Sequence, residues 1–247
     1  MIFKKSKDNI FNKNLGKSQR YTAFTLAEVL IVLAIIGVVA ALTIPMLMNN
    51  YQKTQQVVAL KKVYSQITEA IDRLVVDENV EKFSDTTLHD QTTADAKAFF
   101  KKYFRVSKFC APEDYASCFS DVTSLDKSNF GSPAQDKTCV ILKDGTSICL
   151  GISDNGNLPP VFVVDTNGLN KPNIGGRDIF SFDAYWDGSL DEIMPEDIAI
   201  GTHICSGKGN KETQCSARDS RKNQCETSVY GIGCFSRIID DGWKMDY

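Results

Sequence analysis

A run of apolar residues near the amino terminus constrains this chain more than any other feature. Val29–Met48 contains 20 consecutive residues without a charged side chain. At about 1.5 Å of rise per helical residue, such a run spans roughly the 30 Å hydrocarbon core of a bilayer. The whole chain is 43% hydrophobic and 24% charged, which is the composition of a folded protein. The sequence therefore predicts a membrane-spanning helix joined to a globular part.

The charges on the two sides of this run predict its orientation. The net charge of −3 divides into +5 for residues 1–23, which hold six basic residues and one acidic residue, and −8 for residues 24–247. Because basic residues beside a membrane segment stay in the cytoplasm, we expect a cytoplasmic amino terminus and export of everything after Met48. The acidic exported part is a poor match for the phosphates of nucleic acid, so we do not expect nucleic-acid binding.

One carboxylate, Glu28, stands at the start of the apolar run. An acidic residue at the centre of a membrane helix costs about 2.5–3.5 kcal/mol and less near an end, so a partner or a function is expected unless the residue lies at the interface. A plain membrane anchor does not require it. A signal peptide cut after Val39-Ala40-Ala41 is a second alternative, although the run exceeds the usual h-region of about 7–15 residues.

The stretch around Glu28, AFTLAEVLIVLAIIG, resembles the cleavage and methylation signal of type IV pilins and type II secretion pseudopilins. The shared features are a basic leader, a cut before Phe, Thr-Leu, a glutamate and an unbroken apolar helix. The resemblance implies that a prepilin peptidase cuts between Ala23 and Phe24 and that Phe24 becomes an N-methylated amino terminus. It also implies that Glu28 pairs with the amino terminus of a neighbouring subunit, since two charges attract more strongly where the dielectric is low.

Pro45 fits the same resemblance, because many of these proteins carry a helix-bending proline at this place. The alternative is that Pro45 marks the end of the helix at the membrane surface. The chain departs from the family at Ala23, where glycine is usual, and alanine is small enough that we expect cleavage. The resemblance covers about the first quarter of the chain, chiefly Ala23 to Pro45, and assigns no role to the rest.

These patterns divide the chain into four expected segments: a basic leader (1–23), a membrane and assembly helix (24–48), an amphipathic continuation of that helix (49–76) and a disulfide-containing globular head (77–247). The continuation shows apolar residues at three- and four-residue steps, including Val57, Leu60, Ile67, Ile71 and Leu74. We therefore predict one helix from about Thr25 to Val76 and a second, short helix over Ala94–Phe104. The expected fold class is α+β, with the long helix packed on an antiparallel sheet.

The eight cysteines form an even set without a CxxC pair, and all of them follow the apolar run: Cys110, Cys118, Cys139, Cys149, Cys205, Cys215, Cys225 and Cys234. In an oxidising compartment they predict disulfides rather than a zinc site. Cys110 and Cys118 bracket a turn-prone span and are candidates for a local disulfide. The last four allow three pairings.

The segment TCVILKDGTSICL predicts a β-hairpin. A three-residue loop, Lys143-Asp144-Gly145, places Cys139 opposite Cys149 and puts the apolar residues on the other face. A two-residue Asp-Gly turn would shift the register by one and separate the two cysteines. We therefore predict a cross-strand disulfide between them.

Four hard oxygen donors surround a later loop: Asp165, Asn167, Asn170 and Asp178. Some pseudopilins bind calcium in such a place, although the spacing here is not that of an EF-hand. The alternative is that these residues form Asx turns at strand ends. Near the carboxyl terminus basic residues outnumber acidic ones, which predicts a solvated loop: Lys208, Lys211, Arg218, Arg221 and Lys222.

The chain contains no phosphate-binding loop, no GxSxG elbow and no HExxH, so we do not expect an enzyme or a required cofactor other than the calcium considered above. The preferred interpretation is a structural subunit of a type IV pilus or type II secretion filament, held in the cytoplasmic membrane and then assembled into a periplasmic or cell-surface filament. Its expected partners are other subunits, the prepilin peptidase, the assembly platform and its ATPase motor. The alternatives are a pilin-anchored adhesin or ligand-binding minor pilin, and a plain anchored or secreted disulfide-rich protein.

Overall fold

The computed structural model describes residues 24–88, 92–129, 131–151, 159–192 and 218–247. The chain divides into two compact units, residues 1–47 and residues 48–247, called here the anchor and the head. Helix α1 (Leu26–Asp77) contributes its first part to the anchor and its second part to the head. This helix begins one residue after the predicted start at Thr25 and ends one residue after the predicted end at Val76.

Every apolar side chain of the anchor helix except the half-buried Ala40 is exposed. Leu30, Leu33 and Ile36 keep more than half of their surface accessible, at 57%, 60% and 57%. Within the described residues, one helix, α1, is long and apolar enough to cross a membrane. Pro45 lies inside α1 and the helix continues beyond it, so this proline does not mark the helix end.

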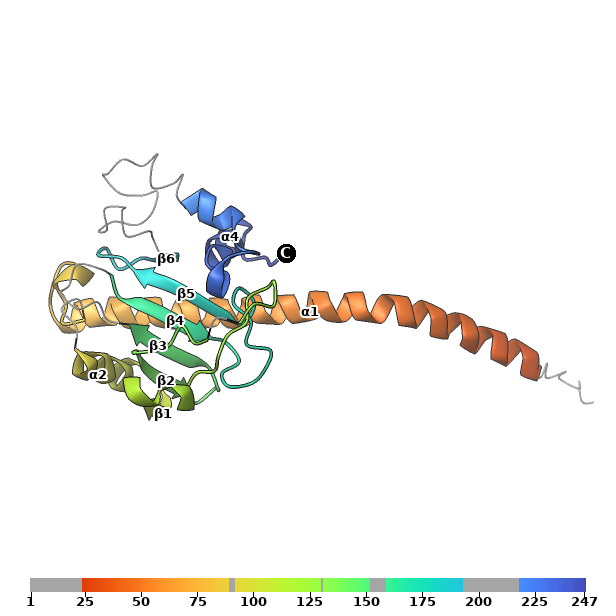
Figure 1. Cartoon of the computed structure of the whole chain (residues 1–247), viewed down its shortest axis with the longest axis horizontal. Helices are drawn as coiled ribbons and strands as arrows, with labels where there is room; N and C mark the ends of the chain where they lie inside the picture. The colour runs from red at the N-terminus through yellow and green to blue at the C-terminus, as the bar shows by residue number, and fades with distance from the viewer. Residues whose placement is uncertain (1–23, 89–91, 130, 152–158, 193–217) are drawn as a thin grey trace, which may run out of the picture. The chain divides into compact units, whose positions relative to one another are not determined.

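The head contains a six-stranded antiparallel sheet in which every strand pairs with its neighbours in the sequence (Figure 1). The strands are β1 (Val106–Cys110), β2 (Thr138–Leu142), β3 (Ser147–Gly151), β4 (Val161–Asp165), β5 (Ile179–Ala184) and β6 (Leu190–Glu192). The remaining helices are α2 (Thr93–Tyr103) and α4 (Cys234–Asp240), with 3-10 turns at Phe83–Asp85, Pro112–Ser117 and Val229–Gly231. Residues 218–223 are also helical. The predicted α+β class is therefore confirmed.

Strands β2 and β3 form the predicted hairpin with its predicted three-residue loop. The amide of Gly145 donates to the Leu142 carbonyl at 3.0 Å, and the amide of Leu142 donates to the Thr146 carbonyl at 2.8 Å. Gly145 has φ = 91°, a left-handed conformation that a residue with a Cβ adopts only with strain. In this register Cys139 lies directly opposite Cys149.

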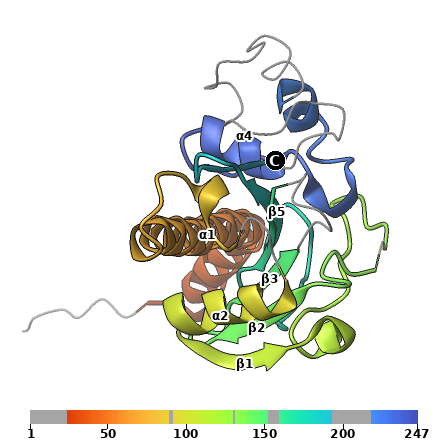
Figure 2. The ribbon, with the colours of Figure 1, turned by 90° about the vertical axis from the view of Figure 1, so that its left-hand side faces the viewer.

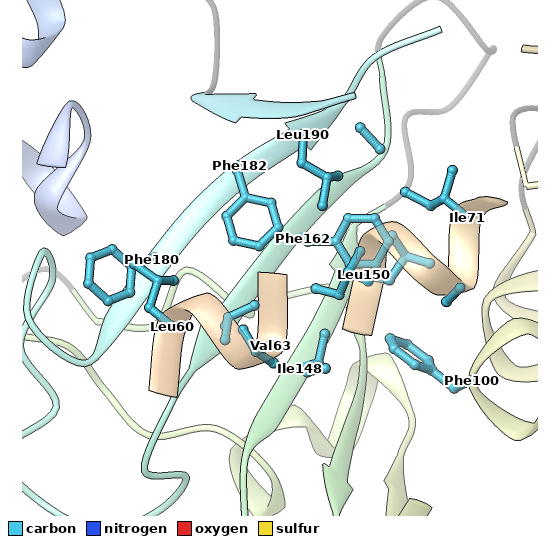
Figure 3. Close-up of a cluster of buried hydrophobic side chains, with 14 of the residues drawn as sticks. Leu60, Val63, Ile71, Phe100, Ile148, Leu150, Phe162, Phe180, Phe182 and Leu190 are labelled. Carbon is cyan, nitrogen blue, oxygen red and sulfur yellow. The ribbon is translucent and has the colours of Figure 1, made fainter. Parts of the chain in front are cut away.

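One face of the sheet packs against the helices of the head. Figure 2 views the head along α1 and shows α2 and α4 on either side of it. In the close-up, Leu60 and Ile71 of α1 lie among apolar residues of β3, β4 and β5, including Phe162 and Phe182 (Figure 3). The amphipathic stripe of α1 is therefore part of the core of the head. Full burial of one such side chain stabilises the folded state by about 1.5–3 kcal/mol.

The other face of the sheet is covered by the segment between β1 and β2. Buried Phe119 and Val122 from this segment pack with Val163 of β4 and with the disulfide-bonded cysteines of the strands. Because successive residues of a strand point to opposite faces, Cys139 and Cys149 pack in this cluster together with Ile141. The other apolar residues of the β2–β3 hairpin lie in the core on the opposite face: Val140, Leu142, Ile148 and Leu150.

Helix α2 begins at Thr93, one residue before its predicted start at Ala94, because Thr92 forms a capping box. The Thr92 side chain accepts a hydrogen bond from the Asp95 amide at 3.3 Å, and the Asp95 carboxylate accepts one from the Thr92 amide at 2.9 Å. The threonine and the acidic residue three positions later are the sequence signal for this boundary.

The carboxyl-terminal segment differs from the expected solvated basic loop. Arg218 is 9% exposed and pairs with Asp191 at 3.1 Å and with Asp240 at 2.7 Å, so its charge is balanced inside the head. The segment also contributes Phe235 and Ile238 to the core. Lys208 and Lys211 lie outside the described residues.

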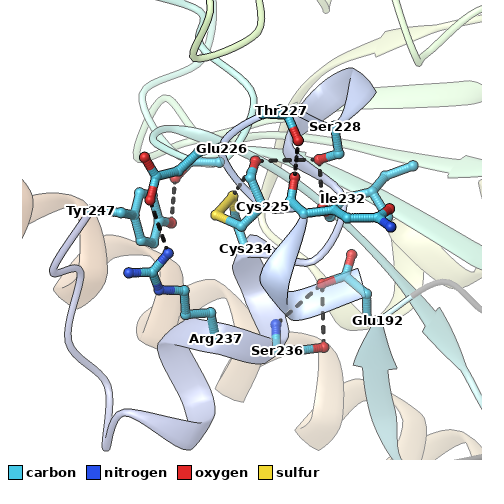
Figure 4. The surroundings of a disulfide bond; sticks show 12 residues. Glu192, Cys225, Glu226, Thr227, Ser228, Ile232, Cys234, Ser236, Arg237 and Tyr247 are labelled. Atoms are coloured by element: carbon cyan, nitrogen blue, oxygen red, sulfur yellow. Dashed lines mark hydrogen bonds and ion pairs between the residues drawn. A yellow bond between two sulfur atoms is a disulfide. The ribbon is translucent and has the colours of Figure 1, made fainter. Parts of the chain in front are cut away.

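Three disulfides connect described residues: Cys110–Cys118, Cys139–Cys149 and Cys225–Cys234. Figure 4 shows the last of these beside α4, where Ser236 donates its amide to the buried Glu192 carboxylate at 3.1 Å. Cys205 and Cys215 lie outside the described residues.

Candidate functional site

The predicted processing and assembly site lies at the start of α1. Ala23 lies outside the described residues, and Phe24, the first described residue, is 85% exposed. Thr25 is the residue before the helix and Glu28 lies in its first turn. An exposed aromatic side chain is therefore followed directly by a helix that begins with a carboxylate.

Thr25 and Glu28 form hydrogen bonds with each other. The Glu28 carboxylate accepts hydrogen bonds from the Thr25 amide at 2.8 Å and from the Thr25 hydroxyl at 2.9 Å. The Thr25 hydroxyl in turn accepts from the Glu28 amide at 3.2 Å. This reciprocal arrangement is a capping box, and the charge also lies at the positive end of the helix dipole. In a single chain, Glu28 thus has hydrogen-bond donors of its own.

The resemblance to pilins implies a partner for Glu28 in a neighbouring subunit and does not include this local partner. The signal was present, because Thr25 and Glu28 have the Thr-x-x-Glu spacing of a capping box before an apolar run. The two roles are compatible. A carboxylate has more acceptor positions than the two donors of Thr25 use.

The surface around Glu28 is apolar and open. Glu28 lines a shallow groove of about 390 Å³ together with Phe24, Val29, Val32 and Leu33. Such a contiguous apolar surface is unusual on a soluble protein and marks contact with lipid or with another protein. Residues 24–47 of the anchor therefore combine one carboxylate with a surface suited to burial.

The head holds the predicted calcium-ligand residues, and the structure brings three of the four together. Asp165 accepts from the Asn167 amide at 3.1 Å, and Asp178 accepts from the Asn167 side-chain amide at 3.1 Å. The first of these bonds is an Asx turn, as the alternative interpretation predicts. Asn170 is exposed, and its side-chain amide donates to the Asn167 carbonyl at 2.8 Å. Asn173, which the sequence analysis did not select, adds a further buried amide.

Burial governs the electrostatics of this loop. Burial, assisted by the nearby charge of Asp178, raises the pKa of Asp165 to about 8. Burial also raises the pKa of Asp178, although its carboxylate accepts from the amides of Asn173 and Ile174 at 2.9 and 2.6 Å. A buried oxygen of each of Asp165, Asn167 and Asn173 has no hydrogen-bond partner within the described part of the chain. Across those same residues, no three His, Cys, Asp or Glu side chains are grouped to hold a metal.

Comparison with known proteins identifies the amino-terminal feature and finds no match for the head. The family described as the prokaryotic N-terminal methylation motif matches residues 19–44, which include the predicted cleavage position, the capping box and most of the apolar run. No curated protein and no solved structure matches the chain. The chain carries the N-terminal methylation motif that is the signature of type IV pilins and pseudopilins.

Proposed function

We propose that this chain is a structural subunit of a filament of the type IV pilus or type II secretion class. The observation that carries the proposal is the capped Glu28 at the start of an exposed apolar helix, within the matched methylation motif. The disulfide-bonded head is consistent with export, because such bonds persist in oxidising compartments. The motif points to a structural protein of this family rather than to an enzyme.

In this proposal, assembly moves the anchor from lipid into a bundle of equivalent helices. Cleavage before Phe24 creates a positive amino terminus one residue from Thr25, and the Glu28 carboxylate of an adjacent subunit pairs with it. The exposed apolar side chains around Glu28 then pack against neighbouring helices instead of lipid. Because an unpaired charge in this environment is unfavourable, the ion pair selects one axial register between subunits.

The expected partners follow from the same proposal. A prepilin peptidase removes residues 1–23, other subunits pack against the anchor, and an assembly platform with an ATPase motor drives extraction from the membrane. The head lies outside the cytoplasm before and after assembly. This location agrees with the basic leader and with the acidic net charge of residues 24–247.

Two substitutions of one residue test the proposal. Glu28→Gln removes the charge but keeps a side chain that can complete a capping box, whereas Glu28→Ala removes both. We expect both variants to insert into the membrane and to be cleaved, and both to yield few or no filaments on electron microscopy of sheared surface material. Glu113→Gln, which changes an exposed carboxylate of the head, is the control and should assemble normally. Normal assembly by Glu28→Gln would show that capping is sufficient and that no ion pair forms.

We further propose calcium binding by the loop between β4 and β5, as a second property of the head. Three buried oxygens without hydrogen-bond partners in the described chain favour it, and carboxylate and amide oxygens are the donors that calcium prefers. Asp165, Asn167 and Asn173 would hold the cation, and Asp178 would contribute charge. The cation would stabilise the loop by balancing the two buried carboxylates.

Thermal unfolding of the full chain tests this role. Millimolar calcium, compared with the same concentration of magnesium, is expected to raise the midpoint of unfolding. Asp165→Asn should abolish the increase, and Asn170→Ala should retain it because Asn170 is exposed outside the buried group. An equal effect of calcium on the Asp165→Asn variant would refute the site.

A further inference from the structure

A polar groove on the head remains without a role in the filament proposal. It lies between residues 52–59 of α1 and residues 166–178, and its volume is about 620 Å³. Three side-chain amides of α1 line one wall, from Gln52, Gln55 and Gln56, and two cations line the other, Lys171 and Arg177. Amide and cationic donors facing one space form a surface suited to an anion with several oxygens.

Arg177 gives the groove a positive charge and hydrogen-bond donors. Its Nε is buried and has no hydrogen-bond partner, and its guanidinium forms no ion pair within the described residues. The adjacent Asp178 also lines the groove, but its two oxygens already accept from the amides of Asn173 and Ile174. An arginine in such a position is suited to bind an anion, because its planar N–H donors match the oxygens of a phosphate or carboxylate.

The position of the groove in the sequence indicates where its anion comes from. Gln52 and Ala59 follow the end of the apolar run at Met48 by four and eleven residues. Because the first wall of the groove begins only four residues along the chain after the membrane-spanning run, covalent connection keeps that wall close to the region of lipid headgroups.

A second groove on the same turns of α1 has the composition of a membrane interface. It measures about 380 Å³, and its lining includes Lys53, Trp243 and Lys244. Tryptophan and lysine are the residues that anchor proteins at the level of headgroups. Four cations and two carboxylates, Asp178 and Asp246, thus line the two grooves of a chain whose residues 24–247 carry a net charge of −8.

We propose that the groove lined by Lys171 and Arg177 binds the phosphate of an anionic phospholipid while the anchor spans the bilayer. Lys171 and Arg177 contact the phosphate, and the glutamine amides of α1 donate to its remaining oxygens or to the polar headgroup. The inference requires only that the anchor is in a membrane, and it does not depend on filament assembly.

The test uses the full chain in nanodiscs that contain phosphatidylcholine with or without phosphatidylglycerol. Native mass spectrometry of the released protein measures the preference for retained phosphatidylglycerol. The double variant Lys171→Gln/Arg177→Gln is compared with Arg105→Gln/Lys143→Gln, which removes the same charge from a different groove of the head. We expect the preference to fall by about fivefold for each cation lost from the proposed site and to persist in the control.

Three other outcomes would overturn the assignment of the groove to a phospholipid. An equal loss in both double variants would show attraction to overall charge and would overturn the site. Competition by inorganic phosphate at low concentration would indicate a site for a soluble anion instead. Unchanged lipid preference combined with failed filament assembly would assign the groove to a neighbouring subunit.

Two additional variants keep the test interpretable. Lys171→Gln alone changes an exposed residue and should show the smaller loss even if Arg177→Gln disturbs the loop. Glu28→Gln should retain full lipid preference, so a failure of the filament proposal is distinguishable from a failure of this one.

Discussion

Removal of the disulfide in the β2–β3 hairpin gives a prediction whose magnitude follows from the structure. Cys139 and Cys149 are 10 residues apart in the sequence, and both are fully buried. In the chain-entropy description, a crosslink closing a loop of this length stabilises the folded state by about 2.7 kcal/mol. We therefore expect Cys139→Ala/Cys149→Ala to lower the free energy of unfolding by about 3 kcal/mol, and the midpoint of thermal unfolding by about 6–12 °C.

The assay is urea unfolding of the full chain in detergent, followed by tryptophan fluorescence. The disulfides Cys110–Cys118 and Cys225–Cys234, with separations of 8 and 9 residues, are matched controls, because chain entropy predicts nearly equal losses for all three. A larger loss of unfolding free energy for the hairpin disulfide than for the other two would measure the additional contribution from packing of its sulfur atoms. A loss of less than about 1 kcal/mol at all three would refute the reasoning from loop closure.

A single substitution in the same hairpin probes the register of three strands. Cys139 lies opposite Cys149 on one side and opposite Cys110 on the other. We expect Cys149→Ala to release Cys139 for exchange with Cys110, leaving Cys118 as a free thiol. Peptide mapping under non-reducing conditions would detect the new pair, and an unchanged Cys110–Cys118 bond with a free Cys139 would contradict the expectation.

Two further predictions concern the core and the pH dependence of the head. Ile67→Ala removes a fully buried side chain of α1 and should lower the free energy of unfolding by about 2–5 kcal/mol, whereas Ser65→Ala on the exposed side should change it by less than about 0.5 kcal/mol in urea unfolding. Burial raises the pKa of Glu192 from 4.5 to about 7, so its contribution to stability is complete below pH about 4.5 and is lost as the pH rises through 7. Glu192→Gln should flatten the unfolding free energy between those pH values, and an unchanged profile would assign the dependence to another group.

The sequence predicted the features that depend on neighbours along the chain. The long helix follows from uninterrupted apolar and amphipathic periodicity, and the hairpin follows from Gly145 and the alternation of its strands. Both are local patterns with one favourable geometry. The capping box of Thr25 and Glu28 is equally local and was not predicted, although its Thr-x-x-Glu spacing is visible in the sequence.

The features that could not be predicted depend on residues far apart in the sequence. Arg218 is buried because it meets Asp191, 27 residues earlier, and Asp240, 22 residues later. Its sequence neighbourhood indicates only a basic, solvated segment. The polar groove similarly requires α1 and the loop before β5 to come together, so no local pattern predicts that Arg177 lacks an ion pair among the described residues.

The mass and amino-terminal sequence of the protein purified from its native membranes or surface filaments test the central claim most directly. We predict a chain that begins at Phe24 and carries one additional methyl group on its amino terminus. A chain that begins at Leu42 would indicate an ordinary signal peptide, and a chain that retains Met1 would indicate a plain membrane anchor. Either of these results would contradict the assignment as a processed filament subunit.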